Sequence, residues 1–385
     1  MTRLTAVLET LETLIGFDTT SRNSNLDVIE WIEAQLTPLG ANCVRIPNSQ
    51  GDKANLWARI GPDVDGGLIL SGHTDVVPID GQDWETDPFH LTAKGDRLFG
   101  RGTSDMKSFI ALCVAFAPAF ARLELPRPVH FAFSYDEEVG CQGAPSMIAE
   151  IRGSGAQPSA VWVGEPTRWD VVSGHKGILL TQVDVTGHEA HSSLPELGLS
   201  AINEAVDLMA VVKEIAEDLR LNAPTDSPFE PAYPTLTIGE VQGGTATNIL
   251  ARSCTFLFDL RCPPGFDPDM ILAPFESAAA RADKRLKDRF PEAGVRVTRL
   301  SNVPPLDIAS DHSGEHLVRA LTGDNALRAV SYATEAGQFS LAGIPAVVCG
   351  PGSIQQAHKP NEYIERAQLE QGVEIFTHLL KRLAT

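Results

Sequence analysis

VHFAFSYDEEVG, residues 129–140, is the stretch that decides the fold, because an apolar run of strand length ends there on a cluster of acids. Successive side chains of a strand point to opposite faces, so Glu137 and Glu138 cannot serve one site if the strand continues through them. The apolar pattern ends near Tyr135, and adjacent side chains can converge in a turn. The sequence therefore predicts that residues 136–140 are not strand.

Three further apolar runs end in the same way on polar residues. They are GLILSGHTD (67–75), AVWVGEP (160–166) and IPAVVCGPG (344–352), the last leading to His358. Runs of this kind, separated by helical patterns, are typical of central strands in an α/β sheet, whose ligands collect beyond the carboxyl ends of the strands. We expect a central mixed sheet flanked by helices, with the four polar clusters at one edge.

The pattern of short apolar runs that end on polar residues is interrupted between about Gly177 and Pro304. Alternating and helical stretches follow one another in a β-α-β-β-α-β order: residues 178–187, 199–221, 235–241, 254–261, 270–289 and 294–300. This order fits a small ferredoxin-like domain of sheet and helices. We predict that residues 178–304 are inserted into a discontinuous first domain formed by residues 1–177 and 305–385.

Composition excludes several classes of function. The formal net charge of −19 disfavours nucleic acid and anionic membranes as partners, since both reward a basic surface. The six cysteines contain no CxxC pair, which favours reduced thiols in a cytoplasmic protein. We expect neither a signal peptide nor a transmembrane segment, because glutamates interrupt the N-terminal helical pattern and no apolar run approaches spanning length.

Each candidate site residue has an ordinary structural interpretation when taken alone. His73 and Asp75 fit a metal ligand with its orienting partner, or a strand-end histidine beside a turn acid. Asp105, after a Gly-rich turn, fits a helix N-cap. Glu165 fits a loop ion pair, and His358 fits an exposed loop histidine. Together, however, two histidines and several carboxylates past strands of one sheet supply the ligand set of a pair of divalent metals.

Six motifs, in this order, carry a family resemblance: GHTDVVP, GRGTSDMK, DEEVG, GEPT, AHSS and GPGSIQQAHKPNEYI. They resemble the aminoacylase and carboxypeptidase-like dinuclear metallohydrolases, and within these most closely the acetylornithine deacetylases. The likeness runs from the first helix to the last and includes the inserted domain.

The resemblance implies a role for each matching residue. It implies two divalent ions per subunit, zinc or alternatively cobalt, bridged by Asp105. Glu138 and His358 would complete one ion, and His73 and Glu165 the other. Asp75 would orient His73, and Glu137 would be the general base.

The resemblance also implies residues for the substrate. His191 resembles an oxyanion donor that acts across a dimer, and the inserted domain would serve as lid and dimerisation domain. Asn248 and Arg261 resemble contacts to the substrate carboxylate, and Glu335 in YATEAGQF is a candidate partner of its amine. Spacing alone favours a surface loop histidine at His191. Asn248 and Arg261 fit strand-end structural residues as well, and Glu335 fits a structural loop.

The activity implied is hydrolysis of N2-acetyl-L-ornithine to ornithine and acetate in arginine biosynthesis, by a cytoplasmic homodimer. The alternatives within the family are deacylation of acetylcitrulline or another N-acyl amino acid, desuccinylation of succinyl-diaminopimelate, and dipeptide hydrolysis. An alternative of another class is an inactive relative that only binds an amino-acid derivative. Such proteins usually lose the base or a ligand, and all of these positions are present here.

Overall fold

The computed structural model describes residues 2–308 and 312–384. The chain forms two compact units, and each is described by itself. The first comprises Met1–Gly174, Leu306–Ala329 and Thr334–Thr385; the second comprises His175–Pro305 and Val330–Ala333.

A six-stranded mixed sheet forms the centre of the first unit, in agreement with the sequence prediction. Four strands run parallel in the order β6-β3-β7-β14, and two antiparallel strands extend the sheet at the β6 side. In spatial order the strands are β1 (Asn42–Pro47), β2 (Ala54–Ile60), β6 (Val129–Ser134), β3 (Leu68–His73), β7 (Ala160–Val163) and β14 (Ala346–Val348). The residues of the parallel strands are buried, as expected for a sheet covered on both faces.

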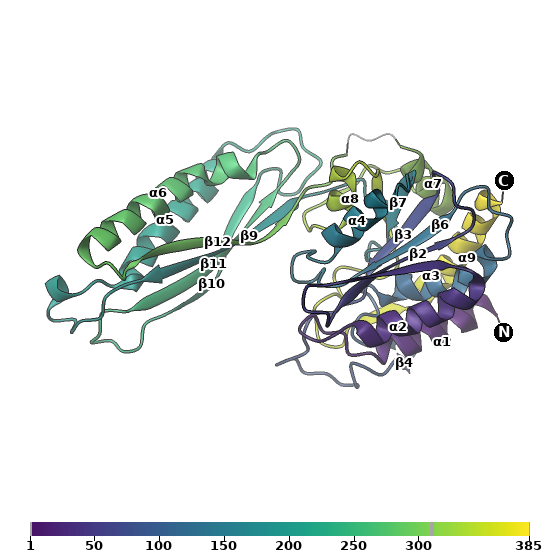
Figure 1. The fold of residues 1–385 in the computed structure, drawn as a ribbon, viewed down its shortest axis with the longest axis horizontal. Coiled ribbons are helices and arrows are strands. Elements are labelled where there is room, and N and C mark those ends of the chain that lie inside the picture. The colour runs from purple at the N-terminus through teal and green to yellow at the C-terminus, as the bar shows by residue number, and fades with distance from the viewer. Residues whose placement is uncertain (1, 309–311, 385) are drawn as a thin grey trace. The chain divides into compact units, whose positions relative to one another are not determined.

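Helices cover both faces of this sheet. In Figure 1, α1, α2 and α3 lie on one face, and α4 and α8 on the other. Phe109 and Phe116 of α3 pack against Phe376 of α9, so the core joins segments that lie far apart in the sequence. The helices are α1 (Arg3–Ile15), α2 (Leu26–Leu36), α3 (Lys107–Phe120), α4 (Ala144–Gly153), α7 (Ser313–Thr322), α8 (Ala336–Leu341) and α9 (Arg366–Leu383).

Several short elements complete the first unit. A three-stranded sheet has the order β15-β5-β4, and its strands are β4 (Thr92–Lys94), β5 (Arg97–Phe99) and β15 (Tyr363–Glu365). The remaining short element is the 3-10 turn Thr37–Leu39. Two further strands, β8 (Gly174–His175) and β13 (Ala329–Val330), pair with each other where the chain passes from one unit to the other.

Three of the four parallel strands carry predicted polar residues at or just beyond their carboxyl ends. His73 is the last residue of β3, and Glu165 follows β7 by two residues. Strand β6 ends at Ser134, and none of residues 135–140 is strand, which confirms that the Glu137–Glu138 pair lies outside the strand. Asp136 has a positive φ of 54°, so the chain turns immediately before the two glutamates.

Helix α3 begins at Lys107, and its N-cap is Met106. Neither Ser104 nor Asp105 caps it. The structural explanation of Asp105 as an N-cap is therefore wrong, and its carboxylate is directed elsewhere.

The second unit is an antiparallel sheet with two long helices. Its elements follow the order β9 (Gly177–Thr186), α5 (Ala201–Leu221), β10 (Thr235–Gly243), β11 (Ser253–Cys262), α6 (Pro268–Arg289) and β12 (Gly294–Val303), with a 3-10 turn at Pro195–Leu197. The sheet order is β10-β11-β9-β12. Burial alternates along β9 and β11, so one face packs against a core that includes Phe256, Phe258 and Phe275.

Within residues 2–308 and 312–384, no helix has the length and apolar character needed to cross a membrane.

Candidate metal centre

A cluster of histidine and carboxylate side chains lies at the strand ends of the first unit. The His73 Nε2 atom lies 3.1 Å from Asp105 Oδ1, and the His358 Nε2 atom lies 3.4 Å from Asp105 Oδ2. Each oxygen of one carboxylate thus faces a different histidine. That arrangement is what a carboxylate shared between two ions requires.

Each histidine has a second carboxylate beside it. The His73 Nε2 atom lies 3.9 Å from Glu165 Oε1, and the His358 Nε2 atom lies 2.9 Å from Glu138 Oε2. The structure therefore brings all five predicted ligands together in two halves that share Asp105. One half contains His73 and Glu165, and the other contains Glu138 and His358.

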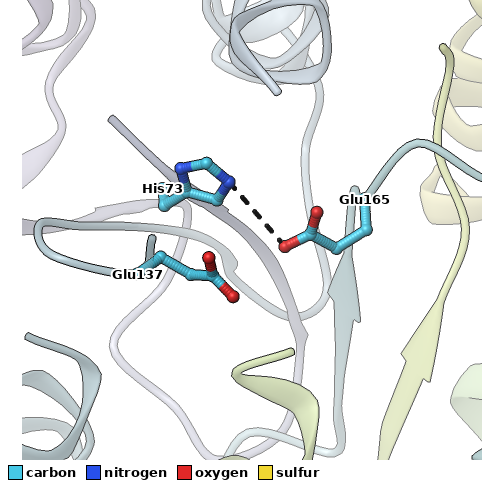
Figure 2. A group of neighbouring side chains, drawn as sticks. All are labelled: His73, Glu137 and Glu165. Atoms are coloured by element: carbon cyan, nitrogen blue, oxygen red, sulfur yellow. Dashed lines mark ion pairs between the residues drawn. The ribbon is translucent and has the colours of Figure 1, made fainter. Parts of the chain in front are cut away.

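Glu137 lies on the His73 side of the cluster. Ligand atoms of His73, Glu137 and Glu165 lie within 4.8 Å of one another, as do those of His73, Asp105 and Glu138. Figure 2 shows the carboxylates of Glu137 and Glu165 directed toward the same space beside the His73 ring. The adjacent glutamates therefore differ in their partners, because it is Glu138 that contacts His358.

The Glu137–Glu138 turn is held by its backbone and by flanking side chains. The backbone N–H groups of Glu137 and Glu138 donate to the two carboxylate oxygens of Asp75, at 3.1 and 3.3 Å. The Ser21 hydroxyl also donates to Asp75, and Lys53 pairs with Asp136 at 2.6 Å. These contacts explain how adjacent side chains of the turn can lie at one site.

Asp75 also fixes the orientation of the His73 ring. The ring Nδ1 lies 2.9 Å from the Asp75 backbone oxygen and 3.6 Å from its carboxylate. An Nδ1–H that donates to a carbonyl leaves the Nε2 lone pair directed at Asp105 and Glu165. This is the tautomer that a metal-bound histidine uses. Asp75 thus contacts His73 mainly through its backbone, while its carboxylate holds the glutamate turn.

The glutamates of the cluster have raised pKa values. Burial raises the pKa of Glu137 to about 8, and repulsion from Glu138 and Asp105 adds to the effect. Burial and repulsion from Asp105 raise the pKa of Glu138 to about 7 and hold that of Glu165 well above its usual range. So many carboxylates in a buried space call for positive charge beyond that of two imidazoles.

One buried oxygen of the cluster lacks a partner. Among the described residues, Glu165 Oε1 makes no hydrogen bond, although it is buried and faces His73. A buried unpaired carboxylate oxygen is costly, and a cation beside it would remove that cost. The oxygen and nitrogen donors present are those that zinc-type ions take. The residues therefore fit a pair of divalent ions.

Glu335 lies deep beside the same strands. Its side chain is 1% exposed, and Ser71 on β3 donates to Oε2 at 3.5 Å. Burial raises its pKa to about 7. Its Oε1 atom makes no hydrogen bond within the described part of the chain.

Three predicted residues belong to the second unit. His191 is exposed, and its segment lies beside that of Asn248, where the Ser192 N–H donates to the Asn248 carbonyl at 2.9 Å. Arg261 is on β11, and its Nε donates to Asp259 at 2.7 Å.

Sequence reasoning missed several residues that hold the site. Cys141 donates to Glu137 Oε1 at 3.2 Å, and Glu362 accepts from the backbone of the Asp105 loop. Cys141 directly follows the motif DEEVG, and Glu362 lies within the motif GPGSIQQAHKPNEYI. No local pattern distinguishes them, because their partners are visible only in the fold.

Comparison with known proteins gives one consistent family. The profile described as peptidase family M20/M25/M40 matches residues 69–382. The chain is 34% identical to an acetylornithine deacetylase of Proteus mirabilis over 340 residues, which cover 87% of this chain and 84% of the relative. It is 35% identical to an acetylornithine deacetylase of Myxococcus xanthus over 366 residues, which cover 94% and 93%.

Solved structures share the fold at lower identity. An M20 family metallo-carboxypeptidase of Sulfolobus solfataricus superposes with a TM-score of 0.76 at 18% identity, covering 98% of this chain and 99% of its own. A tripeptidase of Staphylococcus aureus gives a TM-score of 0.75 at 20% identity, covering 99% and 98%. At these identities the structures establish the fold alone.

Proposed function

Because the chain belongs to peptidase family M20/M25/M40, which confirms the resemblance seen in its motifs, we propose that it hydrolyses N2-acetyl-L-ornithine to L-ornithine and acetate. The chain is a metal-dependent amidohydrolase by family, and its relatives point to N-acyl amino acids as substrates. The finer choice of acetylornithine, and with it a role in arginine biosynthesis, is the proposal.

The placement of Asp105 between two histidine and glutamate pairs is the observation that supports this function most directly. We propose that His73 and Glu165 hold one ion, that Glu138 and His358 hold the other, and that Asp105 is shared. Two zinc ions, or cobalt in their place, would lower the pKa of a bound water and polarise the amide carbonyl.

Glu137 is the proposed general base. Its carboxylate removes a proton from the attacking water and delivers it to the amide nitrogen as the C–N bond breaks. Asp75 holds the Glu137 backbone, and the Cys141 thiol donates to Oε1, so the carboxylate has a fixed orientation. Its backbone support comes from the same acid that orients His73.

The substrate contacts remain proposals carried by the resemblance. His191 would donate to the oxyanion, while Asn248 and Arg261 would bind the α-carboxylate, for which a guanidinium is suited. For Glu335 the support is structural, since a buried carboxylate oxygen without a partner is what an ammonium group would satisfy.

We propose a ferredoxin-like lid and dimerisation role for the second unit. Its β-α-β-β-α-β order and its antiparallel sheet order support the fold assignment. Exposed Ile202 and Val206 on α5 offer apolar surface for a second copy. Light scattering of the purified protein should give the mass of a dimer.

We also propose a cytoplasmic location, which the six free cysteines support.

A substrate panel tests the proposed activity. The zinc-loaded and cobalt-loaded protein should show its highest kcat/KM with N2-acetyl-L-ornithine, ahead of acetylcitrulline, succinyl-diaminopimelate and dipeptides. If the protein is inactive on acetylornithine but turns over another member of the panel well, that compound is the substrate and the enzyme class stands. Fewer than one bound ion per chain after reconstitution would instead favour an inactive relative.

N2-acetyl-L-norvaline, which lacks the side-chain amine of ornithine, is a matched probe for Glu335. Glu335→Gln should raise KM for acetylornithine and leave that for acetylnorvaline unchanged. An equal rise in KM for both substrates would contradict the proposed contact between Glu335 and the substrate amine.

A further inference from the structure

The Glu362 carboxylate is buried, and four donors surround it. Its Oε1 accepts from the backbone N–H groups of Ser104 and Asp105, at 2.8 and 3.0 Å. Its Oε2 accepts from the Gly102 N–H at 3.1 Å and from Arg101 Nη1 at 2.7 Å. The side chain is 1% exposed, so these bonds take the place of hydration.

These contacts shape the loop that ends on the shared ligand. Three backbone N–H groups within four residues converge on one carboxylate, which forms an anion cradle out of the loop itself. Because the Asp105 N–H is one of them, the direction in which the Asp105 side chain leaves the backbone depends on Glu362.

Arg101 connects this cradle to the segment that carries His358. Its Nη1 donates to the Lys359 carbonyl at 3.3 Å, and its Nη2 donates to Gln82 Oε1 at 2.5 Å. Gln82 in turn donates through Nε2 to the His358 carbonyl at 3.0 Å. A continuous set of hydrogen bonds therefore runs from the Asp105 backbone to the His358 backbone.

The His358 segment needs such support more than the other ligands do. His358 has a positive φ of 63°, its side chain is 53% exposed, and the residue lies in a loop and not at a strand end. The bonds from Gln82 and Arg101 are contacts to the backbone of His358 and Lys359, so they act on the position of the ring and leave its nitrogens available.

A purely stabilising ion pair is the alternative interpretation. Buried ion pairs contribute little net stability, because desolvation offsets most of their attraction. The partners of this pair are, however, concentrated on the two segments that carry Asp105 and His358. That distribution favours a role in ligand geometry.

We propose that Glu362 and Arg101 are positioning residues of the metal centre, which set the separation of Asp105 from His358 and so form the half of the site that also contains Glu138. The inference rests on the proposed metal centre and extends it to residues that touch neither ion nor substrate. Partners of this kind, behind the ligands, typically change metal affinity by about ten- to a hundredfold when they are replaced.

The test is Glu362→Gln, which keeps the shape and removes the charge. Glu315→Gln is the matched control, because Glu315 also holds an arginine, Arg319, at 2.8 Å in the first unit, away from the cluster. Metal-free protein is titrated with Zn²⁺ or Co²⁺ by calorimetry, and thermal unfolding of the metal-free form is recorded. We expect Glu362→Gln to weaken one of two binding steps by about ten- to a hundredfold, and Glu315→Gln to leave both unchanged.

Two binding steps of wild-type affinity in Glu362→Gln, with only its unfolding temperature lowered, would overturn the inference and leave the metal centre in place. A wild-type chain that binds no ion would instead overturn the proposed function and the inference with it.

Gln82→Ala gives a second test, which leaves the Glu362–Arg101 ion pair in place although it also removes the oxygen to which Arg101 Nη2 donates. It removes the bond to the His358 carbonyl and should weaken the same binding step by about fivefold, the value of one ordinary hydrogen bond. If Glu362→Gln does not fold, this variant decides the question. Unchanged affinity in Gln82→Ala would then overturn the inference.

Discussion

The two histidines of the cluster stand on different kinds of backbone. His73 ends a buried strand, its side chain is 1% exposed, and its ring is fixed by Asp75. His358 lies in a loop with a positive φ, and its side chain is 53% exposed. The comparison indicates that the sheet alone positions His73 in one half of the proposed metal centre. The other half depends on hydrogen bonds between loops.

Asp105 belongs to both halves, so its replacement should have the largest effect on metal affinity. Asp105→Asn keeps the shape but removes the negative charge, and we expect the affinity for both ions to fall by more than about a hundredfold, beyond the loss typical of residues behind a ligand. Metal analysis after dialysis, with turnover measured in parallel, checks this. Asp324→Asn, a partly buried acid paired with Arg328, is the control and should keep both ions. One ion retained at full affinity in Asp105→Asn would show that the two halves do not share this ligand.

The comparison between the histidines predicts unequal effects on stability. His73→Ala removes the buried partner of Asp105 Oδ1 and of Glu165, and it should lower the free energy of unfolding of the metal-free protein by about 3 kcal/mol. His358→Ala removes a half-exposed partner of Glu138 and Asp105 and should lower it by less, about 1 kcal/mol, because solvent screens the exposed ring. Each variant should lose the ion of its own half.

Urea unfolding of the metal-free variants measures the difference. Equal destabilisation by the two substitutions would contradict the distinction between a sheet-supported half and a loop-supported half.

A buried histidine of the central sheet should also make the stability of the protein depend on pH. Burial lowers the pKa of His130 on β6 to about 4, and its Nδ1 accepts from Trp57 Nε1 at 3.2 Å. Since the unfolded chain binds this proton near pH 6.5 and the folded chain near pH 4, stability falls as pH drops through that window, by up to about 3 kcal/mol. Above pH 6.5 the effect is absent.

His130→Asn offers an oxygen to the Trp57 N–H and removes the titration. Its free energy of unfolding in urea should depend less on pH between 6.5 and 4 than that of the unmodified metal-free protein. The same change at exposed His90 is the control and should leave the dependence unaltered. If the free energy of unfolding of His130→Asn depends on pH as strongly as that of the unmodified protein, groups other than His130 cause the loss of stability in acid.

The sheet and most of the cluster could be predicted because local patterns encode them. Short apolar runs that end on polar residues mark the carboxyl ends of parallel strands, and that rule alone places His73, Glu138 and Glu165 at one edge. The turn that lets Glu137 and Glu138 share a site was predictable from the end of the apolar pattern at Tyr135.

The residues that hold the ligand loops in place could not be predicted in the same way. Glu362 lies 257 residues from the Asp105 N–H that it accepts, and nothing in its neighbourhood distinguishes it from a surface acid. The antiparallel strands β1 and β2 and the three-residue strands β4, β5 and β15 were also missed, because their sequences are too short or too mixed to show a period.

The division of roles between the adjacent glutamates is the central claim, and Glu137→Gln tests it most directly. Turnover of N2-acetyl-L-ornithine and metal content are measured on the same preparation, beside unmodified protein. Loss of a positioned general base should reduce kcat by about 10²- to 10⁴-fold, with both ions retained. Loss of an ion from Glu137→Gln, or turnover equal to that of the unmodified protein, would contradict the assignment.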